Sequence, residues 1–366
     1  MPVKKFSMLI HKWLGLVLSL WLLLITLTGT VLLYKNDLLE WQYPQLDGRS
    51  IASQEQALDT LALDVVQAKA RFSFVPSELH PWVETIDEAG ARHYFSNSGE
   101  FLVSREKYSD WISWFVEFHH HLLLDDLGEE LQGVFGLLTL LVLITGFIKW
   151  WPKGRWQKRD LSVTFSRPGK KRWGQTLWQS HRTLGVILLL PMFLLVLTGV
   201  GMIYYQAFNT GLNAMFPQQA QTVVDYQPII NAQNKEAENL GDDFKTRVLE
   251  AKKIMPGMQP TMLYHDRDGI RFKQPEEWHP NGRSSIAFET NSSKVTKIID
   301  YRNETVGTQL SQKIYPLHIA SVGGITYFSL VVISGVSLIW ITVSGFWFWL
   351  WCRGKKKLAQ QKRKRV

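Results

Sequence analysis

Four long apolar stretches interrupt an otherwise polar chain, approximately at Trp13–Tyr34, Gln132–Trp151, Thr183–Tyr205 and Ile325–Trp351. Each has the roughly 20 residues that a helix needs to cross a bilayer. Apart from Lys149 near one end, none contains a charged residue. The first stretch is longer than the apolar part of a secretory signal, about 7–15 residues, and no Ala-x-Ala-like site follows it. We therefore expect a polytopic membrane protein whose first span is a permanent anchor.

The two long polar segments share one pattern, a helical stretch followed by short extended runs. In the first segment these are Ser53–Ala70, then Trp82–Ile86, His93–Phe95 and Phe101–Ser104, with a turn at Asn97-Ser98-Gly99. In the second they are Asp242–Ile254, then Thr261–His265, Ile270–Lys273, Ser285–Glu289 and Val295–Ile299, with a turn at Asn291-Ser292-Ser293. Each half of the chain is thus predicted to be a span, a helix-plus-sheet module and a second span.

The two halves also repeat individual residues. Aligned on His11 and His181, the first and third spans share Leu14/Leu184, Gly15/Gly185, Leu18/Leu188, Leu24/Leu194, Leu27/Leu197, Thr28/Thr198, Gly29/Gly199 and Tyr34/Tyr204. In the second and fourth spans Thr145-Gly146-Phe147 corresponds to Ser344-Gly345-Phe346, and His119 and His318 each precede that glycine by 27 residues. The predicted fold is a membrane α-helical protein with four transmembrane helices in two parallel repeats, related by a pseudo-two-fold axis along the membrane normal, and two external α+β modules.

The net charge of +9 is unevenly distributed. The connector Lys149–Trp173 has nine Lys/Arg against one acid, and the tail from Arg353 has eight and none. Between Lys35 and Gln132 there are instead seven basic and eighteen acidic residues, and between Gln206 and Gly324 thirteen of each. By the positive-inside rule both termini and the connector are cytoplasmic and both long loops external. The charge therefore reports topology and lipid contact, and requires no nucleic-acid partner.

These patterns divide the chain into eight segments. They are 1–34, cytoplasmic N-terminus and first span; 35–131, external module with an interfacial helix at 110–124; 132–151, second span; 152–182, basic connector; 183–205, third span; 206–324, second external module; 325–351, fourth span; and 352–366, basic tail.

Cysteine and motif content exclude several chemistries. The single cysteine, Cys352, excludes an intrachain disulfide and iron–sulfur or zinc sites with several cysteine ligands. No His-Glu-x-x-His, Gly-x-Ser-x-Gly or Gly-x-Gly-x-x-Gly signature is present, so protease, hydrolase and Rossmann nucleotide sites are unsupported, as is NAD(P)H or flavin binding. No catalytic acid, base or nucleophile is predicted.

Four of the ten histidines are paired by the repeat, and the other six need no special role. A lone interfacial histidine usually just reaches for lipid headgroups, but ionisable residues at membrane depth generally mark function. A two-fold axis brings His11 to His181 on the cytoplasmic side and His119 to His318 on the external side. Each pair offers two opposed imidazoles, which suit the iron of a haem better than zinc, a metal that takes three or four protein ligands.

Small and basic neighbours fit a haem. Gly29 and Gly199 lie five helical turns, roughly 27 Å, from His11 and His181 on the same face, and Gly15 and Gly185 lie one turn away. These glycines leave room for a flat ring or simply allow close helix packing. Lys12 and Arg182 pair with haem propionates or only snorkel to the headgroups. Without a Cys-x-x-Cys-His motif the two haems would be non-covalent, of b type.

The external ligand of the first half is ambiguous because His119 is followed by His120 and His121. A straight helix from His119 to Lys149 would be about 45 Å long, against an apolar core of about 30 Å. We therefore expect an interfacial helix and a turn at Asp125–Gly128. The 27-residue spacing favours His119 as the ligand, with His120 or His121 as alternatives.

The phrases "HKWLGL", "FHHHLLL…ITGFIKWWP", "HRTLGV…LTG" and "YPLHIASVGG…SGFWFWLW" resemble the PepSY-associated transmembrane proteins, over essentially the whole chain. That family includes iron-regulated inner-membrane proteins and ferric-siderophore reductases. The resemblance implies a multi-pass protein of the bacterial inner membrane with periplasmic PepSY-like modules. It also implies two haem b groups held by His11, His119, His181 and His318, and reduction of periplasmic ferric siderophores with release of Fe(II).

The leading functional hypothesis is a transmembrane electron conduit, fed by a cytoplasmic or quinol donor and discharging to an external ferric siderophore. One alternative is a non-enzymatic binding or assembly protein acting through its PepSY-like modules. Another is an iron-chelate permease, disfavoured by the lack of mid-membrane charges and broken helices in the spans.

Overall fold

The computed structural model describes residues 3–47, 51, 53–67, 70–152, 154–155, 157–170, 172–219, 223–237 and 240–363. The chain forms two compact units. We call the first, Met1–Leu33, Phe115–Tyr204 and Val322–Val366, the helical unit, and the second, Tyr34–Trp114 and Tyr205–Ser321, the sheet unit.

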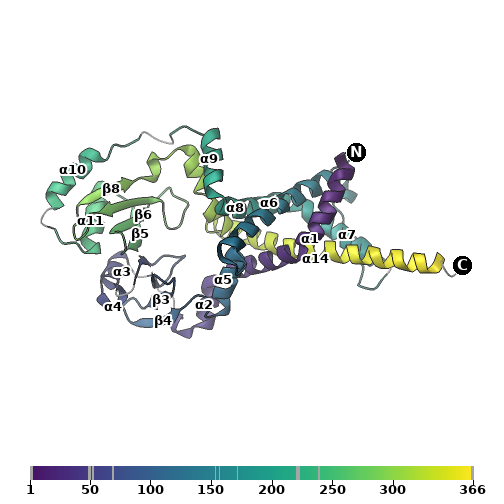
Figure 1. Ribbon diagram of the computed structural model, residues 1–366, viewed down its shortest axis with the longest axis horizontal. Coiled ribbons are helices and arrows are strands. Elements are labelled where there is room, and N and C mark those ends of the chain that lie inside the picture. The colour runs from purple at the N-terminus through teal and green to yellow at the C-terminus, as the bar shows by residue number, and fades with distance from the viewer. Residues whose placement is uncertain are drawn as a thin grey trace. The chain divides into compact units, whose positions relative to one another are not determined.

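The helical unit is a bundle of long apolar helices (Figure 1). They are α1 (Val3–Leu32), α6 (Asp125–Trp150), α7 (Trp173–Ile187), α8 (Leu189–Ile203) and α14 (Gly324–Arg363), joined by the end of α5 (Trp111–His121) and a short 3₁₀ turn, η2 (Lys158–Asp160). Contacts run around the bundle from α1 to α6, from α6 to α7 and α8, from these to α14, and from α14 back to α1. Helices α1, α6 and α14 are each long and apolar enough to cross a membrane, and the bent pair α7–α8 makes a fourth span if it is counted as one.

The third span is broken, which the sequence reading did not anticipate. Helices α7 and α8 meet at Leu188 with a bend of 70°. Pro191 is the third residue of α8, where it has no N–H to donate and its ring would clash with the Ile187 carbonyl of a continuous helix. The prediction of an unbroken helix over Thr183–Tyr205 is therefore wrong, and the argument against a permease from unbroken spans fails with it.

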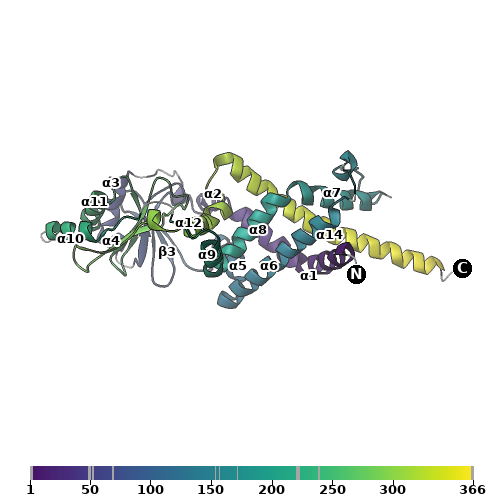
Figure 2. The same ribbon diagram turned by 90° about the horizontal axis from the view of Figure 1, so that it is seen from above.

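The fourth span continues well beyond its apolar stretch. Helix α14 runs for 40 residues and includes the basic segment from Arg353 to Arg363 (Figure 2). Residues 364–366 of the predicted tail lie outside the described part of the chain. The first residues of this basic segment pack on the aromatic end of the span, since Arg353 lies 4.8 Å from the Trp349 ring and Lys355 3.9 Å from that of Trp351.

The sheet unit contains one antiparallel sheet of eight strands in the order β4-β3-β2-β1-β5-β6-β7-β8. The strands are β1 (Phe72–Phe74), β2 (Val83–Ile86), β3 (Arg92–Phe95), β4 (Phe101–Arg105), β5 (Gln259–Tyr264), β6 (Gly269–Lys273), β7 (Ser284–Phe288) and β8 (Val295–Ile299). Its helices are α2 (Lys35–Gln42), α3 (Gln54–Leu61), α4 (Asp64–Gln67), α9 (Tyr205–Met215), α10 (Gln227–Glu236), α11 (Phe244–Ile254), α12 (Val306–Ser311) and α13 (Ile314–His318), with 3₁₀ turns η1 (Pro44–Leu46) and η4 (Tyr301–Asn303).

The two external modules share this sheet. All seven predicted extended runs are strands, but the structure adds β1, which pairs with β5 in the register Phe72↔Tyr264 and Phe74↔Met262. Strand β1 is only three residues long, too short to show an alternating pattern, and its partner lies far along the chain. The expectation of two separate modules is therefore replaced by two four-stranded meanders joined edge to edge.

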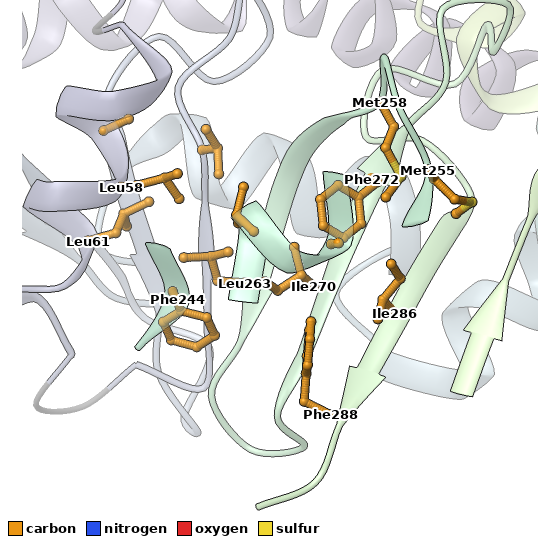
Figure 3. Packing of buried hydrophobic residues seen from close by; sticks show 14 of the residues in the cluster. Leu58, Leu61, Phe244, Met255, Met258, Leu263, Ile270, Phe272, Ile286 and Phe288 are labelled. Atoms are coloured by element: carbon orange, nitrogen blue, oxygen red, sulfur yellow. The ribbon is translucent and has the colours of Figure 1, made fainter. Parts of the chain in front are cut away.

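One face of the sheet is covered by α3 and α11. Leu58 and Leu61 of α3 are in the same buried cluster as Leu263, Ile270 and the other core residues labelled in Figure 3. Each helix begins at a capping side chain, Ser53 accepting from the backbone N–H of Gln56 and Asp243 from that of Thr246. The covering helix therefore starts at a defined residue in both halves.

His279 is buried in the second meander as a neutral imidazole. Its side chain is 7% exposed, its Nδ1 accepts the backbone N–H of Asn281 at 3.2 Å, and its ring stacks on Tyr315 with centroids 5.0 Å apart. Burial, followed by the charges of Arg283, Arg271 and Lys273, lowers the pKa of His279 to about 3.

This burial predicts an acid-labile sheet unit. Between pH 6.5 and 3 the unfolded chain binds a proton at His279 that the folded chain does not, so folding stability falls as pH falls. His279→Phe keeps a ring for Tyr315 and cannot be protonated. We expect wild type to lose about 3 kcal/mol more stability than the variant between pH 7 and pH 4, measured by denaturant unfolding. An equal loss of stability in both proteins over this range would contradict the assignment.

Candidate functional site

The structure brings His11 and His181 together inside the helical unit. His11 lies on α1 and His181 on α7, helices at opposite positions around the bundle. Their ring centroids are 6.0 Å apart and the ring planes are inclined at 77°. The pairing inferred from the repeat is thus observed as a contact between two spans.

The hydrogen bonds of the two rings determine where their protons lie. His11 Nδ1 is 3.0 Å from the carbonyl oxygen of Val142 on α6, and His181 Nδ1 is 2.8 Å from that of Ile341 on α14. A carbonyl oxygen only accepts, so each Nδ1 carries the proton and each neutral ring keeps a lone pair on Nε2. Metal-binding imidazoles are generally held in this way, with one nitrogen on a carbonyl and the other free to ligate.

Glycine permits this close approach. A Cβ added at Gly146 would lie 2.8 Å from His11 Cε1, and one at Gly345 would lie 3.0 Å from His181 Cε1. The hydroxyl one residue earlier bonds to the same carbonyl as the imidazole, from Thr145 at 3.1 Å and from Ser344 at 3.2 Å. We call this arrangement a histidine seat: a helix carbonyl at position i, Ser or Thr at i+3 and Gly at i+4.

A third seat holds His119. Its Nδ1 is 3.2 Å from the Ile25 carbonyl oxygen and 3.2 Å from Thr28 Oγ1, and a Cβ at Gly29 would lie 2.6 Å from its Cε1. Of the two alternatives, His120 is exposed and His121 pairs with Glu117 at 3.3 Å. The geometry therefore favours His119 over both alternatives, as the spacing did.

The same motif occurs in the broken span. Leu195, Thr198 and Gly199 on α8 have the seat spacing, and Thr198 Oγ1 bonds to the Leu195 carbonyl at 3.0 Å. His318, the last residue of α13, belongs to the sheet unit. Its pairing with His119 stays a prediction.

A strained turn follows His119. Leu122, Leu123 and Asp125 have φ of 50°, 61° and 49°, a conformation that costs non-glycine residues about 1 kcal/mol or more each. A Cβ on Gly128 would lie 1.5 Å from the His121 carbonyl oxygen, so only glycine fits there. The chain thus turns over Leu122–Asp125, earlier than the predicted turn at Asp125–Gly128, because α6 already begins at Asp125 and Gly128 lies within it.

The remaining predicted cofactor neighbours are placed as follows. A Cβ on Gly15 would meet nothing within 4 Å, and one on Gly185 only Ile341 Cδ1 at 3.9 Å, which leaves space one helical turn from His11 and His181. Lys12 lies over the Trp13 ring at 4.7 Å, and Arg182 over Trp178 at 4.8 Å. These cation–π contacts agree with interfacial anchoring, and propionate binding stays a prediction.

The inner pair fits a planar metal group held by two imidazoles. Two metal–nitrogen bonds of about 2.0–2.1 Å, made from opposite sides, place the ring centroids about 6 Å apart. A directly touching pair of rings has a similar spacing, so the distance alone does not distinguish the two. The Nδ1–carbonyl bonds leave Nε2 as the ring nitrogen able to ligate, which is compatible with a metal group held by both imidazoles.

The family model for the PepSY-associated TM region matches residues 8–351. The chain belongs to this family. No curated protein matches the chain. PepSY-associated TM membership agrees with the apolar helices in identifying a membrane protein, and the match includes the residues of all three described seats.

Sequence reasoning missed the seats themselves. Thr145-Gly146 and Ser344-Gly345 were used only to align the halves, and Thr28 only as a repeated residue. The sequence does contain a signal for the seats, a Ser/Thr-Gly pair in each of the four spans. Gly29 was predicted to leave room for a flat ring, five helical turns from His11 on the same face, or to allow close helix packing, and the structure places the imidazole of His119 against it.

The seat geometry predicts the effect of one methyl group. In Gly146→Ala the new methyl displaces the His11 ring, and the Nδ1–H bond to Val142 is lost. Gly354→Ala is the matched control, because a Cβ at Gly354 meets nothing within 4 Å. In ¹⁵N-histidine NMR spectra we expect one hydrogen-bonded Nδ1–H signal to disappear in the first variant only. Its persistence in Gly146→Ala would show that the glycine is not required.

Proposed function

We propose that this protein carries electrons across the bacterial inner membrane through two non-covalent haem b groups and reduces ferric siderophores in the periplasm. The observation that supports it most directly is the His11–His181 pair, whose Nδ1–H groups are bound to helix carbonyls and whose Nε2 lone pairs are available. His119 has the same tautomer in a third seat. Membership of the PepSY-associated TM family agrees with a function in the membrane.

Each haem, when bound, supplies an iron that takes up and gives up one electron. His11 and His181 would hold the cytoplasmic-side group, and His119 with His318 the external one. In each seat Nδ1–H donates to a helix carbonyl, so the imidazoles would need no proton exchange during electron transfer. In a bilayer the apolar helices around them would keep water away.

The net reaction transfers one electron from a cytoplasmic or quinol donor to one external Fe(III), giving Fe(II). Hard hydroxamate or catecholate oxygens bind Fe(III) more strongly than Fe(II), so reduction favours release. The chain therefore needs no acid, base or nucleophile of its own. The charge asymmetry supports cytoplasmic termini and a periplasmic sheet unit.

Two alternatives each have an observation in their favour. The outer strands β4 and β8 leave two sheet edges, which suit a binding module that pairs with a partner strand. The broken span at Leu188 suits a permease, because transporters place substrate sites at discontinuous helices. Neither alternative requires imidazoles with free Nε2 atoms.

Absorbance of the detergent-purified protein, expressed with sufficient haem, tests the cofactor. We expect Soret and α bands with about two haems per chain, and about one in His11→Ala or His181→Ala. His120→Ala, on an exposed histidine, is expected to retain both. A colourless wild-type protein would favour the binding module, and unchanged stoichiometry in His11→Ala would reject the pairing.

Stopped-flow mixing of the reduced protein with ferric siderophores tests the substrate. We expect oxidation to be accelerated by at least one ferric siderophore and not by its gallium(III) analogue, which has the same shape and is not reduced. Accumulation of intact gallium chelate in proteoliposomes would instead indicate a permease.

A further inference from the structure

Gln132 and Trp21 form a polar contact in the apolar helical unit. The Gln132 side chain is 5% exposed, and its Oε1 accepts the indole N–H of Trp21 at 2.5 Å. Its Nε2 donates to the backbone carbonyl of His119 at 2.6 Å. One amide thus connects α1 and α6 to the histidine that occupies the third seat.

The His119 carbonyl needs such a donor. Helix α5 ends at His121, so its last four carbonyls have no partner within a continuing helix. The backbone N–H groups of Leu122 and Leu124 bond to the carbonyls of Phe118 and His121. The strained turn provides these two bonds. The Gln132 side chain donates to the carbonyl of His119, which lies between Phe118 and His121 in the chain.

The contact is not repeated in the other half. The repeat offset of 170 residues places Pro191 at the position of Trp21, and the offset of 199 places Val331 at that of Gln132. Neither side chain donates or accepts a hydrogen bond. A buried amide in an apolar span is costly unless both its ends are bonded, so this departure from the repeat marks a specific role.

We propose that Gln132, fixed by Trp21, is a positioning residue for His119, the first-half ligand of the external haem. This inference rests on the proposed function. The seat on α1 holds the imidazole and Gln132 on α6 holds the backbone of the same residue. His119 is thereby fixed at both ends although a left-handed turn follows it.

The principal variant is Gln132→Met, which keeps the length of the side chain and removes both hydrogen bonds. Trp21→Phe is a milder second variant, since it keeps the ring and leaves the bond from Gln132 to His119. Thr139→Val is the matched control, because Thr139 is buried on the same helix and its hydroxyl bonds only within α6, to Phe135. All three are compared with wild type by haem content, redox titration and hydrogen exchange.

We expect Gln132→Met to lose haem from about two toward one per chain, or to shift the potential of one haem while the other is unchanged. Trp21→Phe should give a smaller effect in the same direction, and Thr139→Val none. Unchanged haem content, potentials and exchange in Gln132→Met would overturn the proposal.

A second measurement separates this proposal from the proposed function. In haem-free protein, amide exchange across Phe118–Leu124 should be roughly tenfold faster in Gln132→Met, the size expected for losing one buried hydrogen bond. If wild type binds no haem but this acceleration appears, the electron-transfer function fails while the anchoring of His119 stands. If haem binds normally and no acceleration appears, only the positioning role fails.

Discussion

The helical unit depends on a contact between an imidazole N–H and a helix carbonyl. An N–H in an apolar interior must find an acceptor, because leaving it unbonded costs several kcal/mol. The only acceptors on an apolar helix are its backbone carbonyl oxygens. Side chains normally shield these oxygens from a neighbouring helix. Gly146, Gly345 and Gly29 remove the shield, so three histidines reach carbonyls on neighbouring helices. The hydrogen bond that satisfies the Nδ1–H group therefore also leaves Nε2 as the nitrogen with a lone pair.

The seated histidines lie close in the chain to irregular backbone. The turn after His119 contains three left-handed residues, and α7 ends at a sharp bend seven residues after His181. Neither irregularity would by itself hold an imidazole in a defined orientation. The seats resolve this, because each imidazole is fixed by a helix other than its own, and regular helices α1, α6 and α14 carry the acceptors.

Much of this arrangement could be predicted from the sequence. Composition identified the spans, and strand β8 was located at its exact bounds, because both signals are local. The His11–His181 contact followed from the repeat. The break at Leu188 could have been predicted from Pro191, but the stretch is apolar throughout and was therefore read as one continuous span. The seats could not be located, because a Ser/Thr-Gly pair also fits simple helix packing and only its partner helix gives it meaning.

Sharing one sheet between the two halves has a consequence for synthesis. Strand β1 lies between β2 and β5, and β5 begins at Gln259, so the ribosome must translate almost two hundred further residues before that edge is closed. Until then the first meander presents Phe72 and Phe74 on an open edge. Helix α6 and the bent pair α7–α8 lie between the partners in the chain. Synthesis of the second half is thus also the step that protects the first from pairing with a neighbouring nascent chain.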